Sequence, residues 1–172
     1  MGSDLAQALT GRRLPDVPLA ATDGRSISFA RLAGTTVIFV YPRTSPPGEA
    51  SIPGWDEIPG AKGCTPQTCG FRDHYEELRE AGASEVFGLS VQDTDFQRDV
   101  VARLHLPFAL LSDVDLLLQQ ALGLPTFEAG GMTLLTRMAL VLRDGIIVRV
   151  FHPVDAPAEN AEEVLRFLQG GH

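Results

Sequence analysis

Apolar positions along the chain follow two spacings, one typical of strands and the other of helices. Short apolar runs without helical spacing predict buried strands at residues 36–41, 85–91 and 108–111. Apolar residues at three- and four-residue spacing predict helices over residues 66–80, 96–104 and 113–123, and a last one over 161–168. Strands and helices therefore alternate through the middle of the chain.

Two Asp-Gly steps separate apolar segments and predict tight hairpins. Asp23-Gly24 lies between residues 17–20 and 26–29, and Asp144-Gly145 lies between residues 133–142 and 146–151. An opening hairpin, alternating elements and a closing hairpin with a helix predict an α/β fold. The expected form is a thioredoxin-like mixed sheet with helices on both faces.

A long segment at residues 42–63 fits neither spacing. It contains five prolines and four glycines and predicts a loop that leads directly to Cys64. Trp55 within it is interpreted as a loop anchor in preference to a lid over a site, because single aromatic side chains often fix loops.

Length and charge limit the classes of function. The 172 residues, 44% of them hydrophobic, are enough for one core, so a single domain is expected. The net charge of −8 argues against nucleic-acid binding, and no apolar run approaches the roughly 20 residues that cross a bilayer. With no targeting segment recognised, a cytoplasmic location without membrane association is expected.

The two cysteines are the candidate chemistry. In a reducing cytoplasm a disulfide between them would be transient and catalytic or redox-sensing. Cys64 precedes a helix start at Thr65-Pro66, where backbone amides and the helix dipole favour a thiolate, so a lowered pKa is expected. On a regular helix the Cα atoms of Cys64 and Cys69 would lie roughly 8 to 9 Å apart. A disulfide needs less than about 7 Å, so closure predicts local unwinding, which Pro66 eases.

Other interpretations of these residues stay open at this point. The cysteines could be two small buried hydrophobic residues. A metal site is disfavoured because His74, His105 and His152 are isolated along the sequence.

Several segments resemble the peroxiredoxins, specifically the Q-type group that is also called bacterioferritin comigratory protein-like. The similar segments run through residues 14 to 168 and include FVYPRT, GCTPQTCGFRDHYEEL, VFGLSVQDTDFQRDV, LPFALLSD and TRMALVLRDGIIVRV. The resemblance implies one thioredoxin-like domain at residues 14–169, an N-terminal extension at residues 1–13 and an insertion at about residues 43–62.

The same resemblance implies site residues. Cys64 matches the peroxidatic cysteine, Cys69 the resolving cysteine, Pro42 the active-site proline, and Arg137 the arginine that holds thiolate and peroxide. Arg137 also interrupts an apolar strand, where a guanidinium needs an anion, although a structural ion pair is the alternative.

One position departs from the family pattern. Ala61 stands where the family has a threonine or serine three residues before the cysteine, and Thr44 or Ser45 is the candidate replacement. His74 and His152 are not expected to act as bases, because the helix start and Arg137 already favour the thiolate.

The resemblance implies an enzyme that reduces hydrogen peroxide or organic hydroperoxides without metal or cofactor. A Cys64–Cys69 disulfide would form and be recycled by a thioredoxin-type reductant, in a monomer or weak homodimer. The alternative is a non-enzymatic redox sensor or interaction protein that uses the same disulfide, and a weaker rival is a thiol-disulfide reductase, which normally carries CxxC.

Overall fold

A mixed seven-stranded sheet forms the centre of the molecule in the computed structural model, which describes residues 4–44 and 63–170. The strand order is β2-β1-β5-β4-β3-β8-β9. The strands are β1 Leu19–Ala21, β2 Ser26–Ile27, β3 Thr35–Val40, β4 Ala83–Ser90, β5 Leu110–Ser112, β8 Met138–Arg143 and β9 Ile146–Phe151. β3 pairs parallel with β4 and antiparallel with β8, so the predicted mixed sheet is confirmed. Most of the predicted insertion, including Trp55, lies outside the described residues.

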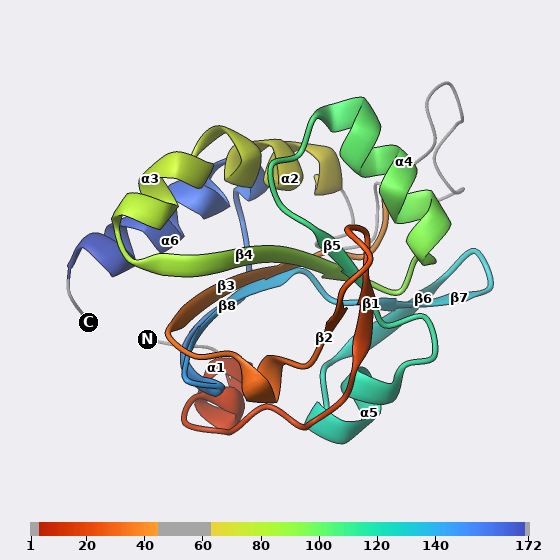
Figure 1. The fold of residues 1–172 in the computed structure, drawn as a ribbon. Coiled ribbons are helices and arrows are strands. Elements are labelled where there is room, and N and C mark those ends of the chain that lie inside the picture. The colour runs from red at the N-terminus through yellow and green to blue at the C-terminus, as the bar shows by residue number, and fades with distance from the viewer. Residues whose placement is uncertain (1–3, 45–62, 171–172) are drawn as a thin grey trace.

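Helices cover both faces of this sheet (Figure 1). α2 Cys64–Asp73, α3 Tyr75–Glu80, α4 Thr94–Leu104 and α6 Asn160–Gln169 lie on one face, and α1 Asp4–Leu9 and α5 Leu117–Leu122 lie on the other. Short 3-10 turns are η1 Phe29–Arg31 and η3 Pro157–Glu159, and η3 leads directly into α6.

β3 is buried on both faces because its last four side chains are all apolar, and Thr36 is buried before them. One face of the strand packs against the helix layer of α2 and α6 through Val37, Phe39 and Tyr41, the last of which directly follows β3. The other face packs against the opposite layer through Ile38 and Val40. All five are 0% exposed. The chain therefore stays buried from β3 to Pro42, which follows Tyr41.

The predicted helix over residues 66–80 is two helices. α2 begins at Cys64, two residues earlier than expected, and ends before His74, whose φ of −103° and ψ of 9° depart from helical values. The His74 ring Nδ1 lies 3.0 Å from the carbonyl oxygen of Gly70. The backbone N–H of His74 donates to the same oxygen at 3.1 Å, so the Gly70 carbonyl serves both groups where α2 ends.

The predicted strand over residues 133–142 is wrong, because it is two strands in two sheets. β7 Met132–Leu135 pairs with β6 Thr126–Ala129 in a separate hairpin, and β8 begins after Arg137. Gly130 and Gly131 form the hairpin turn at φ of +57° and +76°. This Gly-Gly step was the sequence signal for the missed hairpin.

Gly88 in β4 allows the aromatic layer to pack against the sheet. A Cβ atom there would lie 2.7 Å from Cζ of Phe39 and 2.5 Å from Cδ2 of Leu110. The Phe39 ring in turn stacks on Phe71 of α2 with 4.6 Å between centroids. Gly88 thus sets how closely α2 approaches the sheet.

We expect Gly88→Ala to lower the free energy of unfolding by about 1–3 kcal/mol, because the added methyl group overpacks the layer between β3 and β5. Urea unfolding followed by circular dichroism measures the change. Unchanged stability would contradict the close packing of Phe39 and Leu110 on this glycine.

Candidate active site

Cys64 is the first residue of α2 and is 6% exposed. Gly63 precedes it with a φ of +113°, a conformation that favours glycine. A Cβ atom on Gly63 would also lie 2.6 Å from Cγ of Pro157. The first helical hydrogen bond runs from Gln67 N to Gly63 O at 3.0 Å, so Pro66 takes no donor from the helix.

The guanidinium of Arg137 contacts the cysteine sulfur. Nη2 of Arg137 lies 3.1 Å from Sγ of Cys64, and Arg137 is 2% exposed. Arg137 occupies the link between β7 and β8 and not the interior of a strand. The break between the two sheets therefore turns this side chain toward the start of α2.

Gln67 and Asn160 extend the buried polar site, and sequence reasoning missed both. Nη1 of Arg137 donates to Oε1 of Gln67 at 2.6 Å, and Nε2 of Gln67 donates to Oδ1 of Asn160 at 3.0 Å. Gln67 and Asn160 are 0% exposed. A polar residue between the two cysteines was the available signal for Gln67, whereas nothing local marks Asn160.

Burial opposes ionisation of the thiol. Desolvation is the largest influence and raises the pKa of Cys64 above its ordinary value. The charge and hydrogen bond of Arg137, together with the backbone N–H and the charge of Arg43, act in the lowering direction. The lowered pKa expected from the helix start is thus wrong for this folded site, because the sequence did not show how completely the sulfur is buried.

Pro42 and Thr44 lie in the segment that follows β3, and both are buried. The backbone N of Thr44 donates to Oε1 of Gln92 at 3.0 Å, and Nε2 of Gln92 donates to the carbonyl of Thr44 at 2.9 Å. The Thr44 hydroxyl also donates to Oε1 of Gln92, at 3.3 Å. Gln92 therefore holds Thr44 in place, while Ser45 and Ala61 lie outside the described residues.

Cys69 is half-buried on α2, and no disulfide joins it to Cys64. Because the two cysteines lie on one continuous helix, their Cα atoms are roughly 8 to 9 Å apart by helix geometry. The structure is therefore the reduced form with α2 intact. The two histidines considered as bases in the sequence lie elsewhere. His74 directly follows α2, and His152 follows β9, where burial lowers its pKa.

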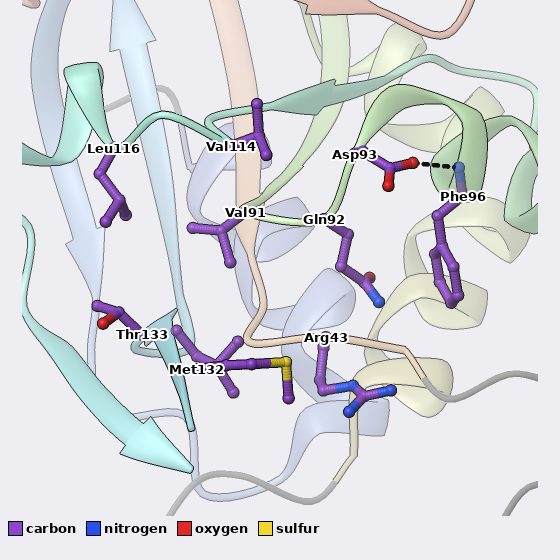
Figure 2. A pocket seen from close by; sticks show the side chains of 10 residues that line it. Arg43, Val91, Gln92, Asp93, Phe96, Val114, Leu116, Met132 and Thr133 are labelled. Atoms are coloured by element: carbon purple, nitrogen blue, oxygen red, sulfur yellow. Dashed lines mark hydrogen bonds between the residues drawn. The ribbon is translucent and has the colours of Figure 1, made fainter. Parts of the chain in front are cut away.

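A pocket of about 490 Å³ adjoins this site (Figure 2). Most of its walls are apolar and come from the segments that follow β4 and β5 and from β7, and they include Val91, Val114 and Met132. The Arg43 side chain also lines the pocket, while its backbone N–H acts on the Cys64 thiol. Arg43 thus connects the pocket with the sulfur.

The part of the chain that the structure describes shows neither a metal centre nor a membrane-spanning helix. Residues 4–44 and 63–170 contain no group of three or more His, Cys, Asp or Glu side chains placed to hold a metal ion. Across those same ranges, no helix has the length and hydropathy to span a membrane.

Comparison with known families and structures places this chain in a family. The Redoxin family model matches residues 9–165. Chloroplastic peroxiredoxin Q of Suaeda salsa is 32% identical over 169 residues, covering 97% of this chain and 71% of the relative. The corresponding protein of Sedum lineare is also 32% identical over 169 residues, covering 97% of this chain and 81% of the relative.

Solved structures agree with this placement. The peroxidoxin BcpB of Mycobacterium tuberculosis superposes with a TM-score of 0.75, covers 95% of this chain and 98% of its own, and at 22% identity shows the fold. A Xanthomonas campestris bacterioferritin comigratory protein, studied for alkyl peroxide reduction, superposes with a TM-score of 0.70 at 25% identity. The match covers 92% of this chain and 96% of that protein.

The chain belongs to the Redoxin family and has the thioredoxin-like fold described above. Within that family it is a peroxiredoxin of the Q or bacterioferritin comigratory protein type, a thiol peroxidase that reduces hydroperoxides. The resemblance seen in the sequence is confirmed.

Replacing Arg137 tests its effect on the thiol. We expect Arg137→Met to raise the pKa of Cys64 further, because the charge and the hydrogen bond that favour the thiolate are removed. Thiolate absorbance at 240 nm against pH, with Cys64→Ser as the blank, measures the pKa. A charged hydrogen bond is worth about 1.5–3 kcal/mol, so peroxide reduction at neutral pH should slow by roughly tenfold to a hundredfold.

The matched control is Arg137→Lys, which keeps the charge and should raise the pKa less than methionine does. An unchanged pKa in Arg137→Met would contradict a direct electrostatic role for this guanidinium.

Proposed function

We propose that Cys64 is the peroxidatic cysteine and that Arg137 is its electrostatic partner. The observation that carries this proposal is the 3.1 Å contact between Nη2 of Arg137 and Sγ of Cys64 in a buried site. The thiolate attacks one peroxide oxygen, the O–O bond breaks, and the other oxygen leaves as water or an alcohol after taking a proton. Sulfur is oxidised to sulfenic acid, and Arg137 stabilises the charge on the leaving oxygen.

Pro42 and Thr44 complete the proposed site. Pro42 shields the sulfur from solvent at the end of β3. Thr44 is the candidate for the hydroxyl that hydrogen-bonds the peroxide. Gln92 fixes its backbone at both the N–H and the carbonyl, and because the hydroxyl donates to Oε1 of Gln92, its oxygen would accept a hydrogen bond from the peroxide.

Cys69 is the proposed resolving cysteine. Its thiol displaces the hydroxyl of the Cys64 sulfenic acid, which leaves as water while the S–S bond forms. The distance imposed by α2 requires that this helix unwind first. A thioredoxin-type protein then reduces the disulfide, and we propose a cytoplasmic enzyme that works as a monomer or weak homodimer.

Serine variants separate the two cysteine roles. Cys64→Ser should abolish peroxide consumption, because serine removes the thiol that contacts Arg137. Cys69→Ser should consume about one equivalent of peroxide and then stop in an assay with thioredoxin and its reductase, because the sulfenic acid has no internal partner. Full turnover by Cys64→Ser would overturn the assignment, and sustained turnover by Cys69→Ser would assign resolution elsewhere.

Peroxide reactivity distinguishes the enzyme from the non-enzymatic redox sensor. An enzyme should react with peroxide far faster than free cysteine does, with a second-order rate constant that depends on Arg137. A rate constant near that of free cysteine would favour the sensor.

The apolar pocket supports organic hydroperoxides as substrates. Its walls lie beside Arg43, whose backbone reaches the thiol, so an organic group can occupy the pocket while the peroxide oxygens face Cys64. Asp93 also lines the pocket, but its carboxylate accepts a hydrogen bond from Phe96 N at 2.8 Å and caps α4 (Figure 2). The rest of the wall is mostly apolar, which favours a hydrocarbon substituent.

A pair of equally exposed residues provides the test. Val114 and Leu117 are each 54% exposed, but only Val114 lines the pocket. Val114→Asn should lower the rate constant for cumene hydroperoxide relative to hydrogen peroxide by about threefold to tenfold, because an apolar contact is lost. Leu117→Asn should leave that ratio unchanged. If the wild-type protein and both variants show the same ratio of the two rate constants, the pocket does not select the substrate.

A further inference from the structure

The buried polar chain does not end at Arg137. It continues through Gln67 of α2 to Asn160, the first residue of α6, which is 93 residues away from Gln67 along the sequence. The proposed chemistry assigns no role to Asn160. It nevertheless joins the thiol site to a helix that contributes neither cysteine.

The donor and acceptor properties of these groups fix the orientation of the Gln67 amide. A guanidinium has only donors, so Oε1 of Gln67 must face Arg137. Nε2 of Gln67 must then face Asn160, which presents its acceptor Oδ1. Asn160 therefore holds the amide in the one orientation that also holds Arg137.

This contact has a cost in the folded structure. Nδ2 of Asn160 is buried without a hydrogen-bond partner among the described residues. A buried unpaired donor is unfavourable, and an apolar side chain of similar size would avoid it. The hydrogen bond that Oδ1 of Asn160 accepts from Gln67 therefore explains an amide at this position better than packing alone does.

The segment before Asn160 also packs closely on α2. A Cβ atom added to Gly63 would lie 2.6 Å from Cγ of Pro157, and one added to Gly70 would lie 3.1 Å from the carbonyl oxygen of Ala158. Gln67 lies between these glycines and between the two cysteines. Unwinding that brings Cys69 to Cys64 must therefore move Gln67 and break its hydrogen bond with Asn160.

We propose that Asn160 is a positioning residue that acts as a latch on α2. Through Gln67 it holds Arg137 against Cys64 and so favours the reaction with peroxide. Through the same hydrogen bond it keeps α2 folded and so slows the disulfide step, in which Cys64 sulfenic acid and the Cys69 thiol form a disulfide and water. This inference rests on the proposed roles of Cys64 and Cys69.

The latch predicts opposite changes in two successive steps. Asn160→Leu should slow formation of the sulfenic acid about fivefold and speed formation of the disulfide about fivefold, as expected for the loss of one buried hydrogen bond. The pKa of Cys64 should also rise, since Arg137 is held less firmly. Rapid quenching with a thiol-alkylating reagent and a sulfenic-acid trap, followed by mass spectrometry, measures both steps in a single turnover.

Three controls separate the latch from loose packing. Val164→Ala removes buried volume from α6 without touching Gln67, and it should not produce the opposite changes. In a Gln67→Leu background, Asn160→Leu should add nothing to either rate, because the residue acts through Gln67. Asn160→Ala serves as the second variant, and thermal unfolding by circular dichroism confirms that each variant is folded.

The outcomes are distinct. Opposite changes that disappear in the Gln67→Leu background support the latch. Two rates that change in the same direction, unchanged rates, or the same pattern in Val164→Ala would overturn it. If the wild-type Cys64 forms no sulfenic acid, it is the proposed function that fails.

Discussion

A guanidinium and a sulfur buried against each other constrain the rest of this molecule. Arg137 is 2% exposed and Cys64 is 6% exposed, with 3.1 Å between Nη2 and Sγ. An isolated buried charge is strongly unfavourable, and a buried thiol resists ionisation, so each group depends on the other. The elements that carry them must therefore meet accurately, and the chain accomplishes this at breaks in regular structure: the helix start after Gly63 and the link between β7 and β8.

The sequence predicts the elements of the fold that have local signals, and it does not predict those that depend on contacts between distant segments. β3 was predicted to within a residue at each end, and the β8–β9 hairpin was predicted from Asp144-Gly145, because both have local signals in apolar runs and turn residues. The break at Arg137 was not predicted. The run from residue 133 to 142 is largely apolar on either side of it, and pairing with β6 across the Gly130-Gly131 turn separates the two strands.

The site divides in the same way. Cys64, Cys69 and Arg137 were selected through the resemblance to the peroxiredoxins, and thiols near a helix start and a charge within an apolar run are local features that supported the choice. Asn160 could not be identified from the sequence, because what connects it to the site is its hydrogen bond with Gln67, which lies 93 residues away along the chain. The direction of the Cys64 pKa was also wrong, because a helix start favours the thiolate locally while burial is a property of the whole fold.

The proposed chemistry makes two opposed demands on α2. Reaction of Cys64 with peroxide would require an intact first turn, because that turn holds Cys64 and Gln67 against Arg137. The proposed disulfide with Cys69 would require the same turn to open. Several features make this compatible with a stable fold: α2 is ten residues long, Pro66 contributes no helical donor, and the chain departs from helical geometry at His74.

The break at His74 limits how far such an opening must extend. Beyond it, α3 packs on the sheet through Leu78, which is 0% exposed, so this helix can stay in place while α2 unwinds. Phe71 is also 0% exposed and stacks on Phe39 near the end of α2, which anchors the last turn. The part of α2 free to move is therefore its first turns, where both cysteines lie, and the strength of their attachment to η3 and α6 decides how readily they open.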